Sequence, residues 1–167
     1  MGDTAYSTTA PPFLPYLNLQ QGIHIDYPAN WVKQEQNAPA GFILLFCSPR
    51  ADYRDEFSEN LNLVIEPLAP GISLDQYFRG TMAGFAQTPL RFIEEGAPAT
   101  LGGYPAYRVM MTGPLQTAMG APLSGKYLQL ITVYNSRGYV LTYTAEMQKY
   151  DAYLPLVEHM IGSFEIR

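Results

Sequence analysis

Two consecutive segments rich in tyrosine, threonine and aliphatic residues constrain the fold most. They read KYLQLITVYNSRG (126–138) and YVLTYTAEM (139–147). Aromatic and β-branched side chains favour strands, and the Asn-Ser-Arg-Gly sequence between the two runs supplies a four-residue turn. We therefore predict a β-hairpin. Most side chains on both of its faces are apolar or aromatic, so the sheet that contains it needs a covering layer on each side.

The rest of the chain supplies further strands and two helices to cover them. Alternating or continuous apolar residues predict strands at 22–28, 42–49, 60–68, 90–96 and 104–115. Helical spacing predicts a helix at 73–87, begun by a capping box in which Ser73 is the N-cap residue and Gln76 is at N3. A final helix has Leu154, Val157, Ile161 and Phe164 on one stripe, with Pro155 expected in its first turn. The fold class predicted is α+β, an antiparallel β-sheet flanked by helices on both faces in an α/β/α sandwich.

The length of 167 residues suits a single domain, which we place at 13–167. Residues 1–12 are polar and end in two prolines, so we expect a flexible leader or tether there. Residues 116–125 read as a flexible insert before the hairpin, and residues 50–59 as a solvated loop.

Composition excludes two classes of function. The net charge is −5 and the ten lysines and arginines form no run, so nucleic acid is not an expected partner. No apolar stretch is long enough to span a bilayer, so membrane association would need an anchor outside this sequence or a membrane-bound partner. Cys47 is the only cysteine and lies in an apolar run, where we expect a buried side chain.

Few residues are candidates for chemistry. His24 and Asp26 alternate on one face of a predicted strand and are a candidate pair of ligands for a weakly bound divalent metal such as Zn, Mn or Ca. Tetrahedral zinc needs three or four ligands, so the pair alone is an incomplete site. The sequence has no G-x-S-x-G and no phosphate-binding glycine loop, so we predict no enzyme activity and no catalytic residues.

A candidate interaction surface combines an aromatic residue with a charged loop. Its residues are Trp31, Asp52, Tyr53, Arg54, Asp55 and Glu56.

The order of these segments resembles the PsbP family, which comprises relatives of an extrinsic photosystem II subunit. The resemblance covers about residues 13–167 and is most specific at LGGYPAY (101–107), YVLTYTA (139–145) and IGSFEI (161–166). It implies an antiparallel sheet between helices, a fold shared with a nuclear-import factor that binds the Ran GTPase, and it does not imply chemistry. The chain is more similar to the compact prokaryotic PsbP-related domains than to the plant subunit.

The resemblance also sets the functional expectation. We predict a non-catalytic binding or assembly module that docks on a membrane or envelope protein complex, associated with a photosystem if the source is phototrophic. Its partner would be a protein, bound through a sheet edge or the loops at 50–59 and 116–125. The alternatives are a small-molecule or divalent-metal-binding domain and, third, an unrecognised hydrolase. The family resemblance implies an extracytoplasmic location in a periplasm, a thylakoid lumen or at a cell surface, with the cytoplasm as the alternative.

Overall fold

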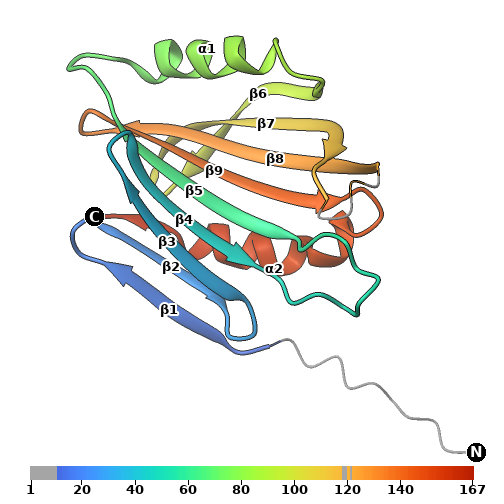
Figure 1. The fold of residues 1–167 in the computed structure, drawn as a ribbon. Coiled ribbons are helices and arrows are strands. Elements are labelled where there is room, and N and C mark those ends of the chain that lie inside the picture. Colours follow the sequence, from blue (N-terminus) through green and yellow to red (C-terminus); the bar gives the residue numbers. More distant parts are fainter. Residues whose placement is uncertain (1–10, 118–119, 121) are drawn as a thin grey trace, which may run out of the picture.

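The protein is described here by a computed structural model that covers residues 11–117, 120 and 122–167. Ten strands form two antiparallel sheets, and two helices pack against them (Figure 1). The strands are β1 (Phe13–Asn18), β2 (Ile23–Pro28), β3 (Val32–Ala38), β4 (Gly41–Cys47), β5 (Asn60–Pro67), β6 (Arg91–Leu101), β7 (Tyr104–Leu115), β8 (Leu123–Tyr134), β9 (Arg137–Glu146) and β10 (Glu165–Ile166). The helices are α1 (Leu74–Phe85) and α2 (Tyr150–Ser163). The predicted leader at 1–12 lies outside the described residues except for its last two prolines.

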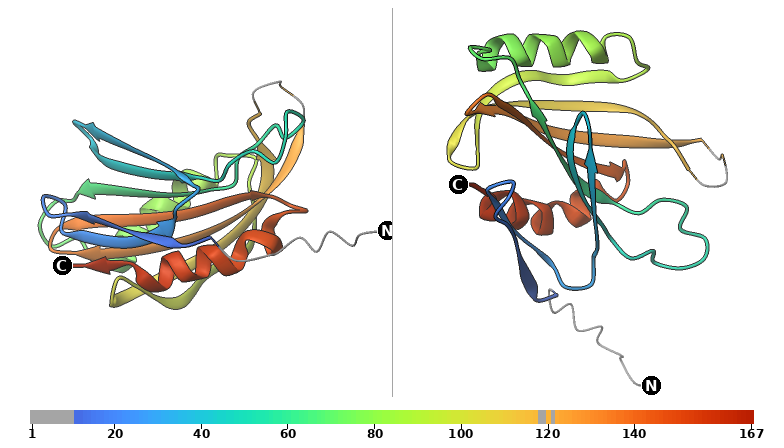
Figure 2. Two further views of the ribbon diagram at one scale, coloured as in Figure 1. Left: turned by 90° about the horizontal axis from the view of Figure 1, so that it is seen from below. Right: turned by 60° about the vertical axis from the view of Figure 1, so that its left-hand side comes forward.

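The large sheet has seven strands in the order β3-β4-β5-β9-β8-β7-β6, and every neighbouring pair is antiparallel. Helix α1 lies on one face of this sheet, and α2 lies on the other (Figures 1 and 2). The predicted α+β sandwich is therefore confirmed. A three-stranded sheet, β1-β2-β10, shares the α2 side, so the strand predicted at 22–28 forms but belongs to this second sheet.

The main core fills the space between the large sheet and the layer made by α2 and the small sheet. Strands β4 and β5 bury alternate residues there, led by Leu44, Phe46, Leu61 and Leu63. A smaller core lies under α1, where Val109, Met111 and Ile131 are buried against the helix. The capping box predicted for α1 is present, because the Ser73 side chain accepts a hydrogen bond from the Gln76 amide and the Gln76 side chain accepts one from the Ser73 amide.

The central hairpin of the sequence forms β8 and β9, with a tighter turn than predicted. Tyr134 pairs with Arg137, so only Asn135 and Ser136 form the loop. Both have positive φ, 49° and 57°, as a type I′ turn requires.

Two other predictions need correction. Residues 97–101, which lie between the predicted strands 90–96 and 104–115, continue β6 beyond two register shifts, and Gly102 and Gly103 alone make the turn.

The second correction concerns Pro155, which lies inside α2, one turn later than predicted. Helix α2 begins already at Tyr150. Because proline lacks an amide hydrogen, this position leaves one carbonyl of the first turn without its helical partner. Phe164, expected in the buried stripe, is indeed 3% exposed and caps the end of the helix.

Candidate docking surface

The loop at residues 50–59 joins β4 to β5 and is closed at its base. The Ser48 amide donates to the Glu59 carbonyl oxygen at 2.8 Å. Asp55 then folds the loop back on itself, because its Oδ2 accepts the Ala51 amide at 2.9 Å. The Asp52 carboxylate accepts the Arg54 amide at 2.7 Å, an Asx turn that sets the conformation of the tip.

A cluster of four charged side chains fixes this loop to the corner between β9 and α2. Lys149 Nζ lies 2.9 Å from Asp55 Oδ1, 2.6 Å from Glu146 Oε2 and 4.0 Å from Glu59 Oε1. The Glu146 amide also donates to Glu59 Oε2 at 3.0 Å. Asp55 and Glu59 are buried, and this contradicts the prediction that residues 50–59 are simply solvated. Sequence periodicity gave no sign of it, because the partner Lys149 is 94 residues away from Asp55.

Burial and hydrogen bonding shift the pKa values of the two buried carboxyls, Asp55 and Glu59, in opposite directions. Desolvation works against ionisation of Asp55, but the hydrogen bonds from the Ala51 amide and Lys149 outweigh it and lower the pKa of Asp55. For Glu59 desolvation dominates over the amide of Glu146 and the charge of Lys149, so the pKa of Glu59 is raised. Within the described residues Glu59 Oε1 has no hydrogen-bond partner, which accounts for the uncompensated cost.

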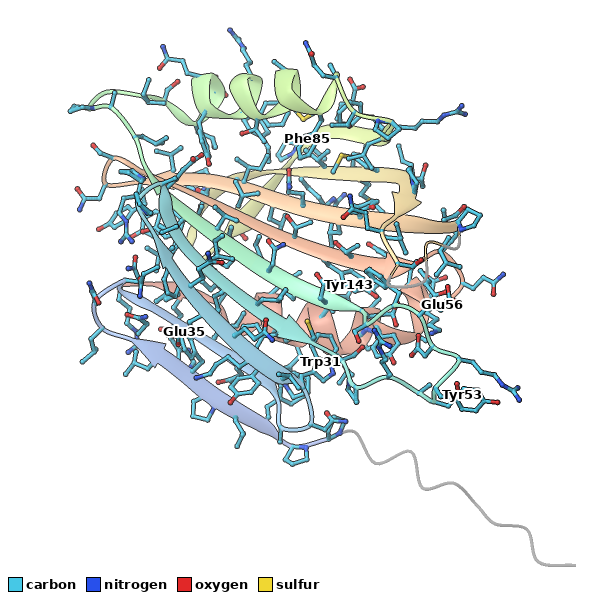
Figure 3. The ribbon with its side chains drawn as sticks, in the orientation of Figure 1. Trp31, Glu35, Tyr53, Glu56, Phe85 and Tyr143 are labelled. Carbon is cyan, nitrogen blue, oxygen red and sulfur yellow. The ribbon has the colours of Figure 1, made fainter. Side chains whose placement is uncertain are left out.

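The loop at residues 50–59 presents one aromatic and one basic side chain to solvent. Tyr53 is 86% exposed and lies at the tip, away from both sheets (Figure 3). Arg54 Nε donates to the Tyr53 hydroxyl at 3.0 Å, and the guanidinium lies 5.2 Å from the ring centroid. Tyrosine and arginine are enriched among the residues that dominate protein–protein binding energy. The loop can therefore act as a preorganised contact element.

The other predicted site residues are placed apart from this tip. Glu56, on the same loop, is partly exposed and borders a cavity of about 110 Å³ together with Arg54, Asp55 and Lys149. Trp31 is 5% exposed and contacts the Tyr153 ring of α2 edge-on, with centroids 6.2 Å apart (Figure 3). Its place on the interaction surface is thus a wrong prediction: the large indole fills the core at the start of β3. Asp55 is likewise an anchor of the loop and is hidden from a partner.

The predicted metal ligands do come together. His24 Nε2 lies 3.3 Å from Asp26 Oδ1 on the partly exposed side of β2. Over the described part of the chain, no group of three or more histidine, cysteine, aspartate or glutamate side chains is arranged to hold a metal ion. The pair remains a two-ligand candidate. Cys47, predicted to be buried, is half-buried, and burial raises the pKa of its thiol.

Several solved structures share the fold of this chain at low sequence identity. No family model and no curated protein sequence matches it. The solution structure of cyanobacterial PsbP (CyanoP) from Synechocystis sp. PCC 6803 superposes with a TM-score of 0.63 at 14% identity, over 100% of this chain and 99% of that one. LpqN of Mycobacterium tuberculosis, involved in cell envelope biogenesis, gives 0.61 at 14% identity, over 92% and 90%. The Ran-binding protein Mog1p of Saccharomyces cerevisiae gives 0.59 at 8% identity, over 93% and 96%.

These likenesses confirm the PsbP-like fold predicted from the sequence. The proteins that share this fold include a Ran-binding protein and a protein involved in envelope biogenesis. In residues 11–117, 120 and 122–167, no helix is long and apolar enough to cross a membrane.

Proposed function

We propose that this protein is a non-catalytic docking module that binds a protein partner through the tip of the 50–59 loop. The observation that carries the proposal is an 86% exposed tyrosine that accepts a hydrogen bond from the neighbouring arginine, on a loop whose base is fixed by Lys149. A contact element held in place before binding loses less conformational entropy when the complex forms. The Ran-binding neighbour supports a protein as the kind of partner.

We further propose that the partner belongs to a membrane or envelope complex and that the module works outside the cytoplasm, on a photosystem if the organism is phototrophic. The support is the fold shared with CyanoP and with the envelope-biogenesis protein LpqN. Fractionation of cells that express the tagged product of the whole gene tests the location. Recovery in the cytoplasmic fraction alone would reject it.

Affinity capture from native membranes tests the docking proposal. The bait is the full chain, and two double variants serve as comparison: Tyr53→Ala with Arg54→Ala, and His24→Ala with Asp26→Ala. We expect the wild type and the β2 variant to retain the same partner, and the loop variant to bind it at least about tenfold more weakly, as loss of a binding hot spot predicts. Equal binding by the loop variant would refute the assignment to this loop.

The double variant His24→Ala with Asp26→Ala also tests the second candidate function, which is divalent-metal binding by these two residues of β2. That candidate has one specific observation in its favour, the 3.3 Å approach of the two side chains. Calorimetric titration with Zn²⁺, Mn²⁺ or Ca²⁺ should show heat that the double variant abolishes, and flat titrations of the wild type would exclude it.

A further inference from the structure

Strand β3 is a free edge of the large sheet. In the described chain it pairs with β4 only, and six of its seven residues are exposed. The β3–β4 hairpin projects from the body of the molecule, so its outer edge is accessible (Figure 2). An exposed edge offers a row of backbone amides and carbonyls that a further strand can pair with.

The sheet face beside this edge lacks charge. Successive cross-strand pairs, such as Gln34 with Leu45 and Leu45 with Asn62, show which residues share the face that carries α1 at its other end. The uncharged face comprises Val32, Gln34, Gln36, Ile43, Leu45, Cys47, Asn60, Asn62 and Val64, and it ends at Glu66 of β5, on the same side of the sheet, which accepts a hydrogen bond from Tyr77 of α1. Nine neighbouring residues without a charge are notable in a chain with 25 ionised side chains of Lys, Arg, Asp and Glu, 10 basic and 15 acidic. Depletion of charge is typical of the centre of protein–protein interfaces.

The two charged residues of β3, Lys33 and Glu35, indicate which kind of strand pairs with this edge. Lys33 and Glu35 lie on the opposite side of the strand from the uncharged face, 3.8 Å apart and beside β1, where Lys33 Nζ is 4.9 Å from the centroid of the Tyr16 ring, and each side chain is still more than a third exposed (37% and 38%). When two copies of β3 pair antiparallel about a twofold axis at Gln34, Lys33 faces the partner's Glu35 and Glu35 faces the partner's Lys33. Centring the axis on Lys33 or on Glu35 instead places like charges opposite each other. Opposite-charge pairs across strands stabilise a sheet, and like charges destabilise it.

We infer that two copies of this chain associate through β3, antiparallel and centred on Gln34. The two large sheets then form one continuous sheet, and the two uncharged faces merge into a single surface across the axis. Only residues 32–36 of each copy pair fully, which is a small contact beside the roughly 800 Å² per partner of a typical stable interface. The dimer is therefore reversible and depends on concentration. The inference is independent of the loop at 50–59.

Charge exchange tests the register. Sedimentation equilibrium of the full chain over a range of concentrations should show the 18.6 kDa monomer giving way to twice that mass. Lys33→Glu alone, or Glu35→Lys alone, should weaken self-association roughly 5- to 30-fold, since each puts two like-charge pairs across the axis. The double variant Lys33→Glu with Glu35→Lys should restore it, and an equimolar mixture of the two single variants should form a mixed dimer. Restoration distinguishes pairing at this register from a general charge effect.

Cross-linking gives a second measurement that detects a weak dimer. In a Cys47→Ser background, Gln34→Cys should form an intermolecular disulfide under mild oxidation, because the two copies of residue 34 face each other at the axis. Gln36→Cys on the same face serves as the control, since its copies are held four residues out of register. All the residues changed on β3 are exposed, so near-ultraviolet circular dichroism should confirm intact folding. A monomer at every concentration, a double variant that fails to recover, or equal cross-linking of both cysteine variants would overturn the inference.

Discussion

The ammonium of Lys149, at the start of α2, lies 2.9 Å from the buried carboxylate of Asp55, in the loop between β4 and β5. This contact ties the long connection between β4 and β5 to the corner where β9 enters the last helix. It also decides where the exposed Tyr53 and Arg54 are held. The position of the loop proposed to dock thus depends on one partly buried ion-pair cluster.

Removing the charge of Asp55 should destabilise the protein. Asp55→Asn loses the attraction to Lys149 while Glu59 and Glu146 remain, and we expect a loss of roughly 2–3 kcal/mol in the free energy of unfolding. Urea denaturation followed by circular dichroism measures it. Asp52→Asn is the matched control, because Asp52 is exposed and an amide oxygen can still accept the Arg54 amide. Equal stability of the two variants would show that the cluster does not hold the loop.

The buried cluster should give opposite pH dependences for its two buried acids. The folded-state pKa of Asp55 lies below its ordinary value of 3.8, so its contribution to stability is complete above that pH and is lost as the pH falls further. The folded-state pKa of Glu59 lies above 4.5, so the folded chain binds the extra proton and stability falls as the pH rises through that shifted pKa.

Glu59→Gln isolates the second effect. The amide keeps an acceptor for the Glu146 amide hydrogen and removes the cost of a buried charge, so the variant should melt at a higher temperature than the wild type near neutral pH. The difference should shrink below about pH 4.5, where the wild-type carboxyl is protonated in both states. A variant less stable than the wild type at pH 7 would mean that the attraction to Lys149 outweighs desolvation.

Sequence periodicity predicted the layers well because burial on one face has a local signature. The alternation in β5 and the capping box at Ser73 are each set within a few residues. Sequence periodicity could not predict the small sheet, since β10 has only two residues and β1 buries only one of its six residues, so neither shows a pattern. Strand β3 was missed for the same reason, as an edge strand with no buried face has no apolar period.

The site residues also differ in whether a local sequence property determines their exposure. Tyr53 and Arg54 were named from the polar character of their segment, which is a local property, and both are exposed. Trp31 was misplaced because a tryptophan next to a turn gives no sign of which side it faces. The burial of Asp55 and Glu59 depends on Lys149, so only the tertiary structure reveals it.

The hairpin turn offers a test of backbone strain. Ser136 has φ of 57°, a conformation that costs a non-glycine residue energy and that glycine adopts freely. Ser136→Gly creates the Asn-Gly pair preferred in type I′ turns and should stabilise the protein by about 0.5–1 kcal/mol. Ser136→Val, with a branched Cβ at the same position, should destabilise it. Thermal unfolding compares the three, and a Val variant as stable as the Gly variant would contradict the turn type.

Replacement of Gly138, which lies under α1, and of Gly80, which lies within α1, by alanine should change the stability of the protein in opposite directions. A Cβ at Gly138 on β9 would lie 2.4 Å from the ring of Tyr77, whose hydroxyl donates to Glu66 at 2.5 Å. Gly138→Ala must therefore displace the ring, and we expect a loss of about 1–3 kcal/mol from overpacking. Gly80 lies inside the helix with nothing within 4 Å of the same added atom, so Gly80→Ala should stabilise by up to about 1 kcal/mol through helix propensity. Chemical denaturation of both variants measures the contrast. If Gly138→Ala left the free energy of unfolding unchanged, the Tyr77 ring would not be packed tightly on β9. The contact that holds α1 on the sheet would then have to lie elsewhere.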